Sequence, residues 1–127
     1  MTKEIDMESL TIFFLLFTKH FIIDFPLQPK YQYSNKGIYG HPGGLLHSAL
    51  HTIGTVFVLC WFVNPVTAIS LALLDGVLHY HIDWAKVNLN AKLGYGPTTH
   101  EEFWWLLGLD QYLHSVTYAL IVFIAIK

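Results

Sequence analysis

Four long apolar blocks dominate the chain of 127 residues and restrict what it can fold into. A helix needs about 20 residues to cross the hydrocarbon core of a bilayer, and each block is of this order. The blocks predict an all-α, four-transmembrane-helix bundle that forms a single domain over residues 1–127, with helices at about 8–25, 45–63, 66–85 and 103–126. A soluble helical bundle is the alternative, but its helices would need polar outer faces, which the first, second and fourth blocks almost lack.

The composition agrees with a membrane protein. Hydrophobic residues make up 54% of the chain and charged residues 13%, whereas a soluble domain has about 25% charged residues. Arginine is absent, the seven lysines are scattered and the net charge is −2. Proteins that bind nucleic acid cluster their basic residues, so we expect membrane lipid and metal ions, and no nucleic acid, as partners. A homo-oligomer is compatible with the sequence.

The connections between the blocks set the expected orientation. A very short turn joins the second and third blocks, whereas residues 26–44 and 86–102 form long polar connections on one side of the membrane. That side holds four lysines and the other side two: Lys30, Lys36, Lys86 and Lys92 against Lys3 and Lys127. Because cytoplasmic loops are enriched in basic residues, we expect a protein of the bacterial inner membrane with its long connections in the cytoplasm and both termini outside.

Each block carries a pair of ionisable residues four positions apart. Side chains at this spacing lie on one face of a helix, one above the other. The pairs fall near the ends of the first and third blocks and near the starts of the second and fourth: His20 and Asp24, His47 and His51, His79 and Asp83, and Asp110 and His114. Because consecutive helices alternate in direction, all four pairs are expected in one layer just inside the cytoplasmic interface.

Five histidines and three aspartates in one layer favour a metal site. An ionised group inside a membrane costs about 3 kcal/mol or more, and such groups are candidates for function by default. Divalent cations neutralise the carboxylates and use imidazoles as neutral ligands. Eight ligands suit two metal ions of about four protein ligands each, with zinc favoured and iron or manganese as alternatives. The competing interpretation is a hydrogen-bonded core of His–Asp pairs without metal, as in a proton relay.

Further polar residues lie near the predicted ligands. Asp75, in the third block, is a candidate general base. Gln28 and Gln111 are placed to orient a ligand or a bound water molecule. Lys86 lies at the mouth of the expected site, where it would meet an anionic group of a substrate. His81 is expected outside the ligand set.

Four segments of the chain resemble a family of small bacterial and phage membrane proteins that is known only as a domain of unknown function. The segments are His20–Gln28, Leu46–His51, His79–Lys86 and Leu109–His114, and they occur in the family's order. The resemblance covers nearly the whole chain. It implies that Gln28, Lys86 and Gln111 belong to the site, because they lie within the matching segments, and it implies no particular reaction.

The site chemistry favours a membrane-embedded, metal-dependent hydrolase. Two metal ions polarise a substrate and activate a bound water molecule. A site that opens at the cytoplasmic interface would act on a lipid head group, a lipid-linked phosphate or an amide.

Three other functions compete with hydrolysis. One is a divalent metal transporter or metal-binding membrane protein, although eight ligands would hold an ion tightly and transport requires release. Another is a di-iron oxygenase, although the chain has neither adjacent histidines nor the Glu-x-x-His motif of soluble di-iron bundles. The last is a non-catalytic membrane component in which the metal stabilises the fold.

Overall fold

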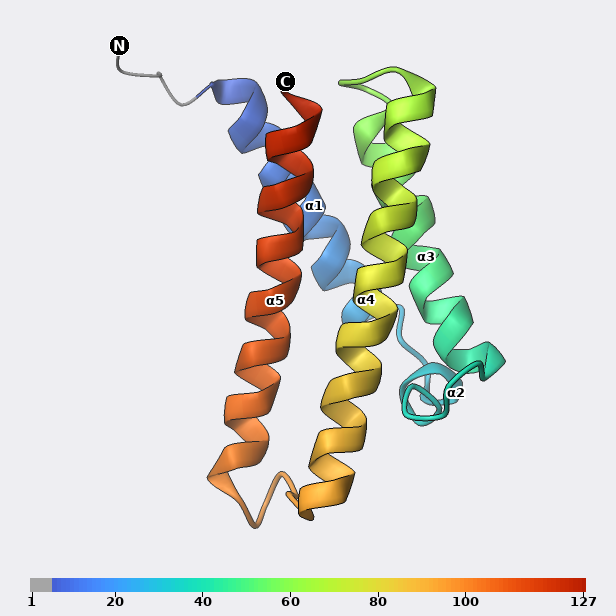
Figure 1. Cartoon of the computed structure of the whole chain (residues 1–127), viewed down its shortest axis with the longest axis vertical. Coiled ribbons are helices and arrows are strands. Elements are labelled where there is room, and N and C mark those ends of the chain that lie inside the picture. The colour runs from blue at the N-terminus through green and yellow to red at the C-terminus, as the bar shows by residue number, and fades with distance from the viewer. Residues whose placement is uncertain (1–5) are drawn as a thin grey trace.

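The computed structural model describes residues 6–127, which form helices and no strand (Figure 1). In chain order these are α1 (Met7–Asp24), α2 (Lys30–Tyr33), α3 (Pro42–Leu59), α4 (Pro65–Leu93) and α5 (Glu101–Ala125). The prediction of an all-α fold is confirmed, and each predicted block corresponds to one of the four long helices. The short helix α2 was not predicted. Lys3, on which the expected orientation partly rests, lies outside the described residues.

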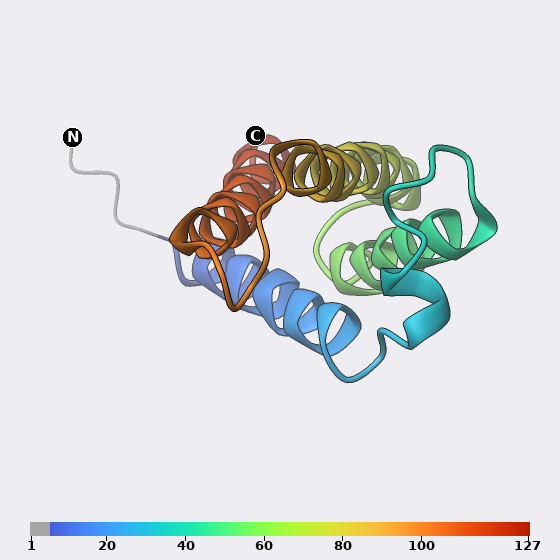
Figure 2. The ribbon, with the colours of Figure 1, turned by 90° about the horizontal axis from the view of Figure 1, so that it is seen from below.

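The four long helices surround a common axis. Helix α1 packs against α3 and α5, and α4 packs against the same two helices, so α1 and α4 lie across the bundle from each other. The end-on view in Figure 2 shows this ring, with α2 beside α3. Consecutive long helices alternate in direction. The end of α1, the start of α3 and the middle parts of α4 and α5 therefore reach the same level (Figure 1).

Local sequence signals explain where the helices begin. The Asp6 carboxylate accepts a hydrogen bond from the Glu8 backbone N–H at 3.1 Å and caps α1. Helices α3 and α4 each begin with a proline, Pro42 and Pro65. Proline is well suited to this position because its φ is already helical and its missing N–H would have no partner. Helix α3 therefore already includes residues 42–44, which the sequence predicted as the end of the polar connection at 26–44.

Helix α4 is longer than predicted. It continues past residue 85 to Leu93 and ends at Gly94, whose φ of 69° is the left-handed conformation that glycine adopts readily. Residues 86–93 are thus helical, and the predicted connection at 86–102 is corrected to a shorter one at 94–100. The prediction failed because the apolar pattern ends at residue 85, whereas the backbone meets no glycine or proline before Gly94.

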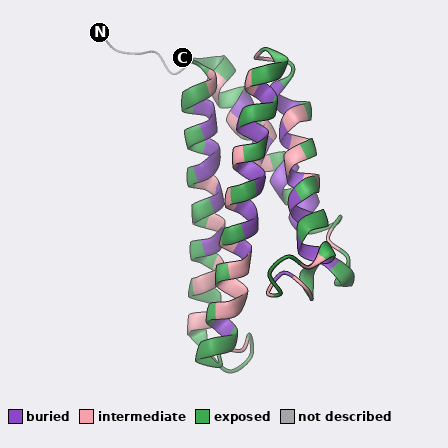
Figure 3. Cartoon of the chain, turned by 45° about the vertical axis from the view of Figure 1, so that its right-hand side comes forward, coloured by how far each residue is buried: buried purple, intermediate pink, exposed green. Residues whose placement is uncertain are grey.

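The apolar core occupies one end of the bundle, next to the chain's C-terminus and the turn between α3 and α4. We call it the apolar half. Its buried residues come from all four long helices: Ile12, Leu16, Val58, Leu59, Ala68, Leu71, Tyr118, Ile121 and Val122. Figure 3 shows the buried faces turned inward along the helices and exposed residues along the outer faces. The other half of the interior is polar and is described below.

Large apolar side chains cover much of the outer surface. Phe14, Phe57, Trp61 and Val66 are each about 70% exposed or more. Within the described residues, α5 is the one helix long and apolar enough to cross a membrane. Length and composition therefore support one span rather than the four predicted. The other long helices contain polar and charged residues of the interior, such as Lys19, and these residues lower the mean hydropathy of each helix.

Candidate metal centre

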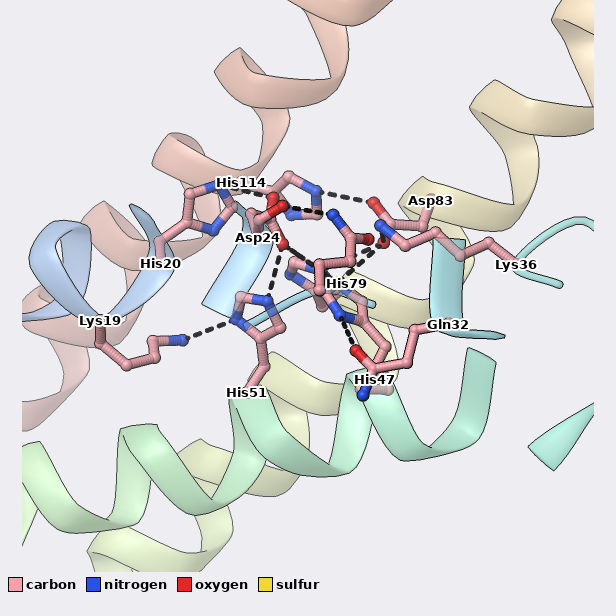
Figure 4. A network of polar contacts seen from close by, with 12 residues as sticks. Lys19, His20, Asp24, Gln32, Lys36, His47, His51, His79, Asp83 and His114 are labelled. Carbon is pink, nitrogen blue, oxygen red and sulfur yellow. Dashed lines mark hydrogen bonds and ion pairs between the residues drawn. The ribbon is translucent and has the colours of Figure 1, made fainter. Parts of the chain in front are cut away.

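The eight predicted metal ligands converge in the interior of the bundle. They form three groups in which the nitrogen and oxygen atoms that would bind metal all lie within 4.8 Å of one another. The groups are His20, Asp24, His51 and His79; His47, His79 and Asp83; and Asp83, Asp110 and His114. His79 and Asp83 each belong to two groups, so the eight residues make one continuous cluster, which we call the His–Asp cluster. All eight are buried, and Figure 4 shows most of them in close-up.

The Asp24 carboxylate lies at the centre of one side of the cluster. Its Oδ2 is 3.0 Å from His20 Nε2. Its Oδ1 is 2.8 Å from His51 Nε2 and 3.0 Å from His47 Nε2. His79 Nε2 lies farther away, 3.5 Å from the same oxygen. One carboxylate at the end of α1 therefore faces imidazoles from α1, α3 and α4.

The Asp83 carboxylate lies at the centre of the other side of the cluster. Its Oδ2 lies 2.7 Å from Lys36 Nζ and 3.2 Å from His79 Nε2. Its Oδ1 lies 3.2 Å from His114 Nε2. Asp110 Oδ1 lies 3.6 Å from the same imidazole nitrogen and 3.3 Å from Lys86 Nζ. Two lysines thus approach this side of the cluster from the loop after α2 and from α4.

A hydrogen bond to Gln32 determines which ring nitrogen of His47 carries the proton. The Gln32 amide oxygen lies 3.2 Å from His47 Nδ1 and accepts its proton. In the neutral imidazole the other nitrogen, Nε2, then carries a lone pair. That lone pair faces Asp24 Oδ1 at 3.0 Å and His79 Nε2 at 3.1 Å. A lone pair beside a carboxylate is repulsive unless a cation lies between them or the imidazole is protonated.

The donor set fits a divalent transition metal. Imidazole nitrogens and carboxylate oxygens are the ligands that zinc, iron and manganese accept. A histidine ligand usually donates its second ring N–H to an oxygen acceptor, as His47 does to Gln32. Asp83 Oδ2 and Asp110 Oδ1 are buried and each faces a lysine ammonium group, at 2.7 Å and 3.3 Å. Both oxygens therefore already lie beside positive charge, which a carboxylate that binds a cation also accepts.

His51 is held differently from His47. Lys19 Nζ lies 3.2 Å from His51 Nδ1, and an ammonium group only donates, so Nδ1 is the acceptor. His51 Nε2 then carries the proton and donates to Asp24 Oδ1 at 2.8 Å. In this arrangement His51 is a hydrogen-bond donor to Asp24. To bind metal through Nε2, its contact with Lys19 has to change.

A family comparison covers all of these residues. A family model described as a protein of unknown function (DUF3307) matches residues 12–127. The chain belongs to this family. The match begins within α1 and includes every member of the His–Asp cluster, which confirms the resemblance to a family of unknown function. Its bacterial or phage origin and its membrane spans stay predictions. No curated protein and no solved structure matches the chain.

Asp75 lies outside the three groups. Its Oδ2 accepts hydrogen bonds from Lys19 Nζ at 3.0 Å and from the Thr55 hydroxyl at 2.5 Å. Lys19 Nζ also donates to the Tyr118 hydroxyl oxygen at 3.2 Å. The role of general base stays a prediction, while these contacts indicate that Asp75 holds the buried ammonium group in place. Lys19 was not identified from the sequence, although a lone lysine next to His20 in an apolar helix was a usable signal.

The three residues implied by the resemblance contact the cluster or its helix. Gln111 bridges two ligands: its oxygen lies 2.9 Å from His20 Nε2, and its amide nitrogen donates to Asp110 Oδ2 at 2.9 Å. Lys86 forms the ion pair with Asp110. Gln28 donates to the backbone carbonyl of Asp24 at the end of α1.

Two further histidines, His81 and His41, lie outside the cluster. His81 is exposed and contacts the Val77 carbonyl oxygen and the Tyr39 hydroxyl. His41 caps α3 by accepting a hydrogen bond from the Gly43 backbone N–H at 3.0 Å. Gln32 and Tyr118, in contrast, contact the cluster and were missed. Both contacts join residues far apart in the sequence, so no spacing rule reveals them.

Proposed function

We propose that this chain is a membrane-embedded, metal-dependent hydrolase whose His–Asp cluster binds two divalent metal ions. The observation that carries the metal site is the position of His47 Nε2. It faces a carboxylate oxygen at 3.0 Å and a second imidazole nitrogen at 3.1 Å, while Gln32 accepts the proton of Nδ1. A cation held by His47, Asp24 and His79 would remove the repulsion, and His47 is oriented to serve as a neutral ligand.

The outer surface supports embedding in a membrane. Contiguous exposed apolar surface on this scale is rare in soluble monomers and marks contact with lipid or a partner. Apolar side chains are exposed on every long helix, among them Phe14 on α1, Phe57 on α3, Val77 on α4 and Leu113 on α5. Lys19, Asp75 and the eight residues of the His–Asp cluster are buried inside the bundle instead, as expected of ionisable groups in a membrane. His81 on α4 is an exception and is exposed. We propose that all four long helices span the bilayer and that the α2 side faces the cytoplasm.

When bound by the His–Asp cluster, the metal ions would activate a water molecule for hydrolysis. The protein's own contribution is to hold the ligands and exclude water from the rest of the cluster. A narrow cleft adjoins the cluster and is lined by Lys36, Gly44, His47, Tyr80 and Asp83. These five residues are buried and leave no space for a water molecule, so a substrate enters the cleft only when a lining side chain moves. The position of the cleft beside the start of α3 supports a substrate that approaches from the interface, namely a lipid head group, a lipid-linked phosphate or an amide.

Elemental analysis by mass spectrometry of the full chain, purified in detergent, tests this proposal. We expect about two transition-metal ions per chain, the number that eight ligands accommodate, in the wild type and in the control His81→Ala. In His47→Ala we expect most of the metal to be lost, because a ligand of the shared middle group is removed. Metal-loaded protein is then assayed against lipid phosphoesters and lipid amides.

The matched control makes the outcome decisive. His47 and His81 lie on neighbouring helices, and only His47 belongs to the cluster. Absence of metal after resupply of zinc, iron and manganese overturns the proposal and favours the metal-free His–Asp network. Equal metal loss from both variants contradicts the ligand assignment. Bound metal without hydrolysis of any lipid refutes the hydrolase function and leaves a metal-binding or metal-transporting protein.

A further inference from the structure

The charges around the His–Asp cluster do not balance once metal is bound. Beside its three carboxylates lie the Lys19–Asp75 ion pair and two further lysines, Lys36 and Lys86. With neutral imidazoles, these groups together carry one negative charge. Two divalent cations convert this into an excess of three positive charges in a buried site, where uncompensated charge is costly. A hydroxide bound with the metal ions would compensate one of these charges, and an anionic substrate would compensate the others.

The two lysines mark where such an anion would lie. Lys36 Nζ is 2.7 Å from Asp83 Oδ2, and Lys86 Nζ is 3.3 Å from Asp110 Oδ1. Asp83 and Asp110 belong to the same group, so both ammonium groups approach the same side of the cluster. Lys36 is only 7% exposed and lines the cleft. Figure 4 shows its side chain directed toward Asp83. Phosphate oxygens accept charge-assisted hydrogen bonds from such groups, whereas a neutral amide leaves the charge uncompensated.

An apolar groove lies next to the cleft, and Tyr80 lines both. It has a volume of about 330 Å³ and runs between α3 and α4, with Ala49, Leu73 and Val77 among its lining residues. The Tyr80 hydroxyl oxygen accepts a hydrogen bond from the Gly40 backbone N–H at 2.6 Å. The groove wall is therefore fixed at the point where it meets the polar site.

Small side chains form the floor of the groove. Ser48 donates a hydrogen bond to the Gly76 carbonyl oxygen at 2.7 Å and so joins the two helices. A Cβ atom at position 76 would collide with the Thr52 hydroxyl, so α3 and α4 approach closely here because Gly76 has no side chain. The groove consequently lies between larger side chains on the membrane-facing side of this contact. An alkyl chain fits a surface of this kind.

From the charge excess and the groove we infer that the substrate is a lipid with a phosphate ester, whose phosphate lies beside Lys36 and whose alkyl chain lies in the groove between α3 and α4. This inference rests on the proposed metal site and narrows its substrate class. Among the three kinds of substrate considered above, only a phosphate-bearing lipid matches both features.

Native mass spectrometry of the zinc-loaded full chain, titrated in detergent with dioleoyl phosphatidic acid, tests the inference. Dioleoylglycerol, which lacks the phosphate, and inorganic phosphate, which lacks the chains, are the comparison ligands. We expect Lys36→Met to weaken phosphatidic acid binding roughly tenfold or more, because a charge-assisted hydrogen bond is lost. Ala49→Phe, which fills the groove, is expected to weaken it several-fold. Lys92→Met and Ala119→Phe make the same two substitutions at exposed positions away from the site and serve as controls. Both should bind phosphatidic acid as the wild type does.

The zinc content of each sample is measured in the same experiment, which separates the two proposals. A chain that holds no metal refutes the proposed function. A metal-loaded chain that binds phosphatidic acid no more tightly than dioleoylglycerol overturns only the present inference. Equal binding by Lys36→Met and Lys92→Met also overturns it. If inorganic phosphate competes as well as the lipid does and Ala49→Phe binds normally, the ligand is a free phosphate and the lipid assignment is wrong.

Discussion

The same four helices build two different interiors at two levels of the bundle. In the apolar half, residues such as Ile12 and Leu16 on α1 are fully buried against other apolar side chains. A turn or two later, α1 buries Lys19, His20 and Asp24 instead. Burial of apolar side chains stabilises the fold through the hydrophobic effect. Buried charged groups lower stability unless each has a partner. The comparison indicates that the apolar half stabilises the bundle, whereas the polar half is stable only because its charged groups have partners inside the bundle.

Tyr118 lies at the boundary between the two halves. It is fully buried and belongs to the apolar core, where its ring contacts Phe17 edge to face. Its hydroxyl group points into the polar half, 2.7 Å from His20 Nδ1 and 3.2 Å from Lys19 Nζ. Tyrosine suits such a boundary because one end is apolar and the other forms hydrogen bonds. The two halves are therefore structurally joined, and we expect mutations to separate their contributions to stability and to the proposed metal binding.

The largest effect on stability is expected in the polar half. Lys19→Met removes the buried partner of Asp75, and an uncompensated buried charge costs about 3–5 kcal/mol. Unfolding in mixed detergent micelles, followed by circular dichroism, measures this loss. The double variant with Asp75→Asn is expected to recover much of it, because the unpaired charge is then removed. A single variant as stable as the exposed control Lys92→Met would show that the ion pair contributes nothing.

A comparable effect without any change in metal binding is expected in the apolar half. Leu16→Ala leaves a cavity in the fully buried core, and such substitutions cost about 2–5 kcal/mol. The same unfolding titration measures the loss, and elemental analysis should give an unchanged metal content. Loss of metal from this variant would mean that the two halves are not separable. Leu120→Ala, on the exposed face of α5, is the matched control and should change stability little.

The smallest effect is expected from Gln32, which contacts the cluster only through His47. Gln32→Ala removes the acceptor of the His47 Nδ1 proton. Loss of such an outer hydrogen bond typically weakens metal binding by about 10–100-fold. Competition with a zinc-binding dye measures the affinity, and the apolar half should unfold as in the wild type. Gln32→Glu, which keeps an oxygen acceptor, should restore tight binding. Unchanged zinc affinity in the alanine variant would argue against His47 as a ligand oriented by α2.

The sequence alone predicts the helices and the eight residues of the cluster. The spacing of four within each apolar block places two ionisable side chains on one helix face, and the alternation of helix direction brings the four pairs to one level. Both arguments use only local geometry and chain connectivity. The structure brings together these eight residues, while the metal they are predicted to bind awaits experiment. Helix ends were less accurate, as the extension of α4 to Leu93 shows, because an apolar pattern ends where burial ends and not where the backbone stops being helical.

Only the tertiary structure decides how each of these residues is held. It brings Gln32 into contact with His47 and Lys19 into contact with His51. These two histidines are one turn apart on α3, and His47 carries its proton on Nδ1 whereas His51 carries it on Nε2. The tertiary structure also pairs Asp75, the predicted general base, with Lys19 and Thr55. These contacts join residues between 15 and 56 positions apart. No periodicity specifies contacts at such separations, because they depend on how the helices pack around the common axis.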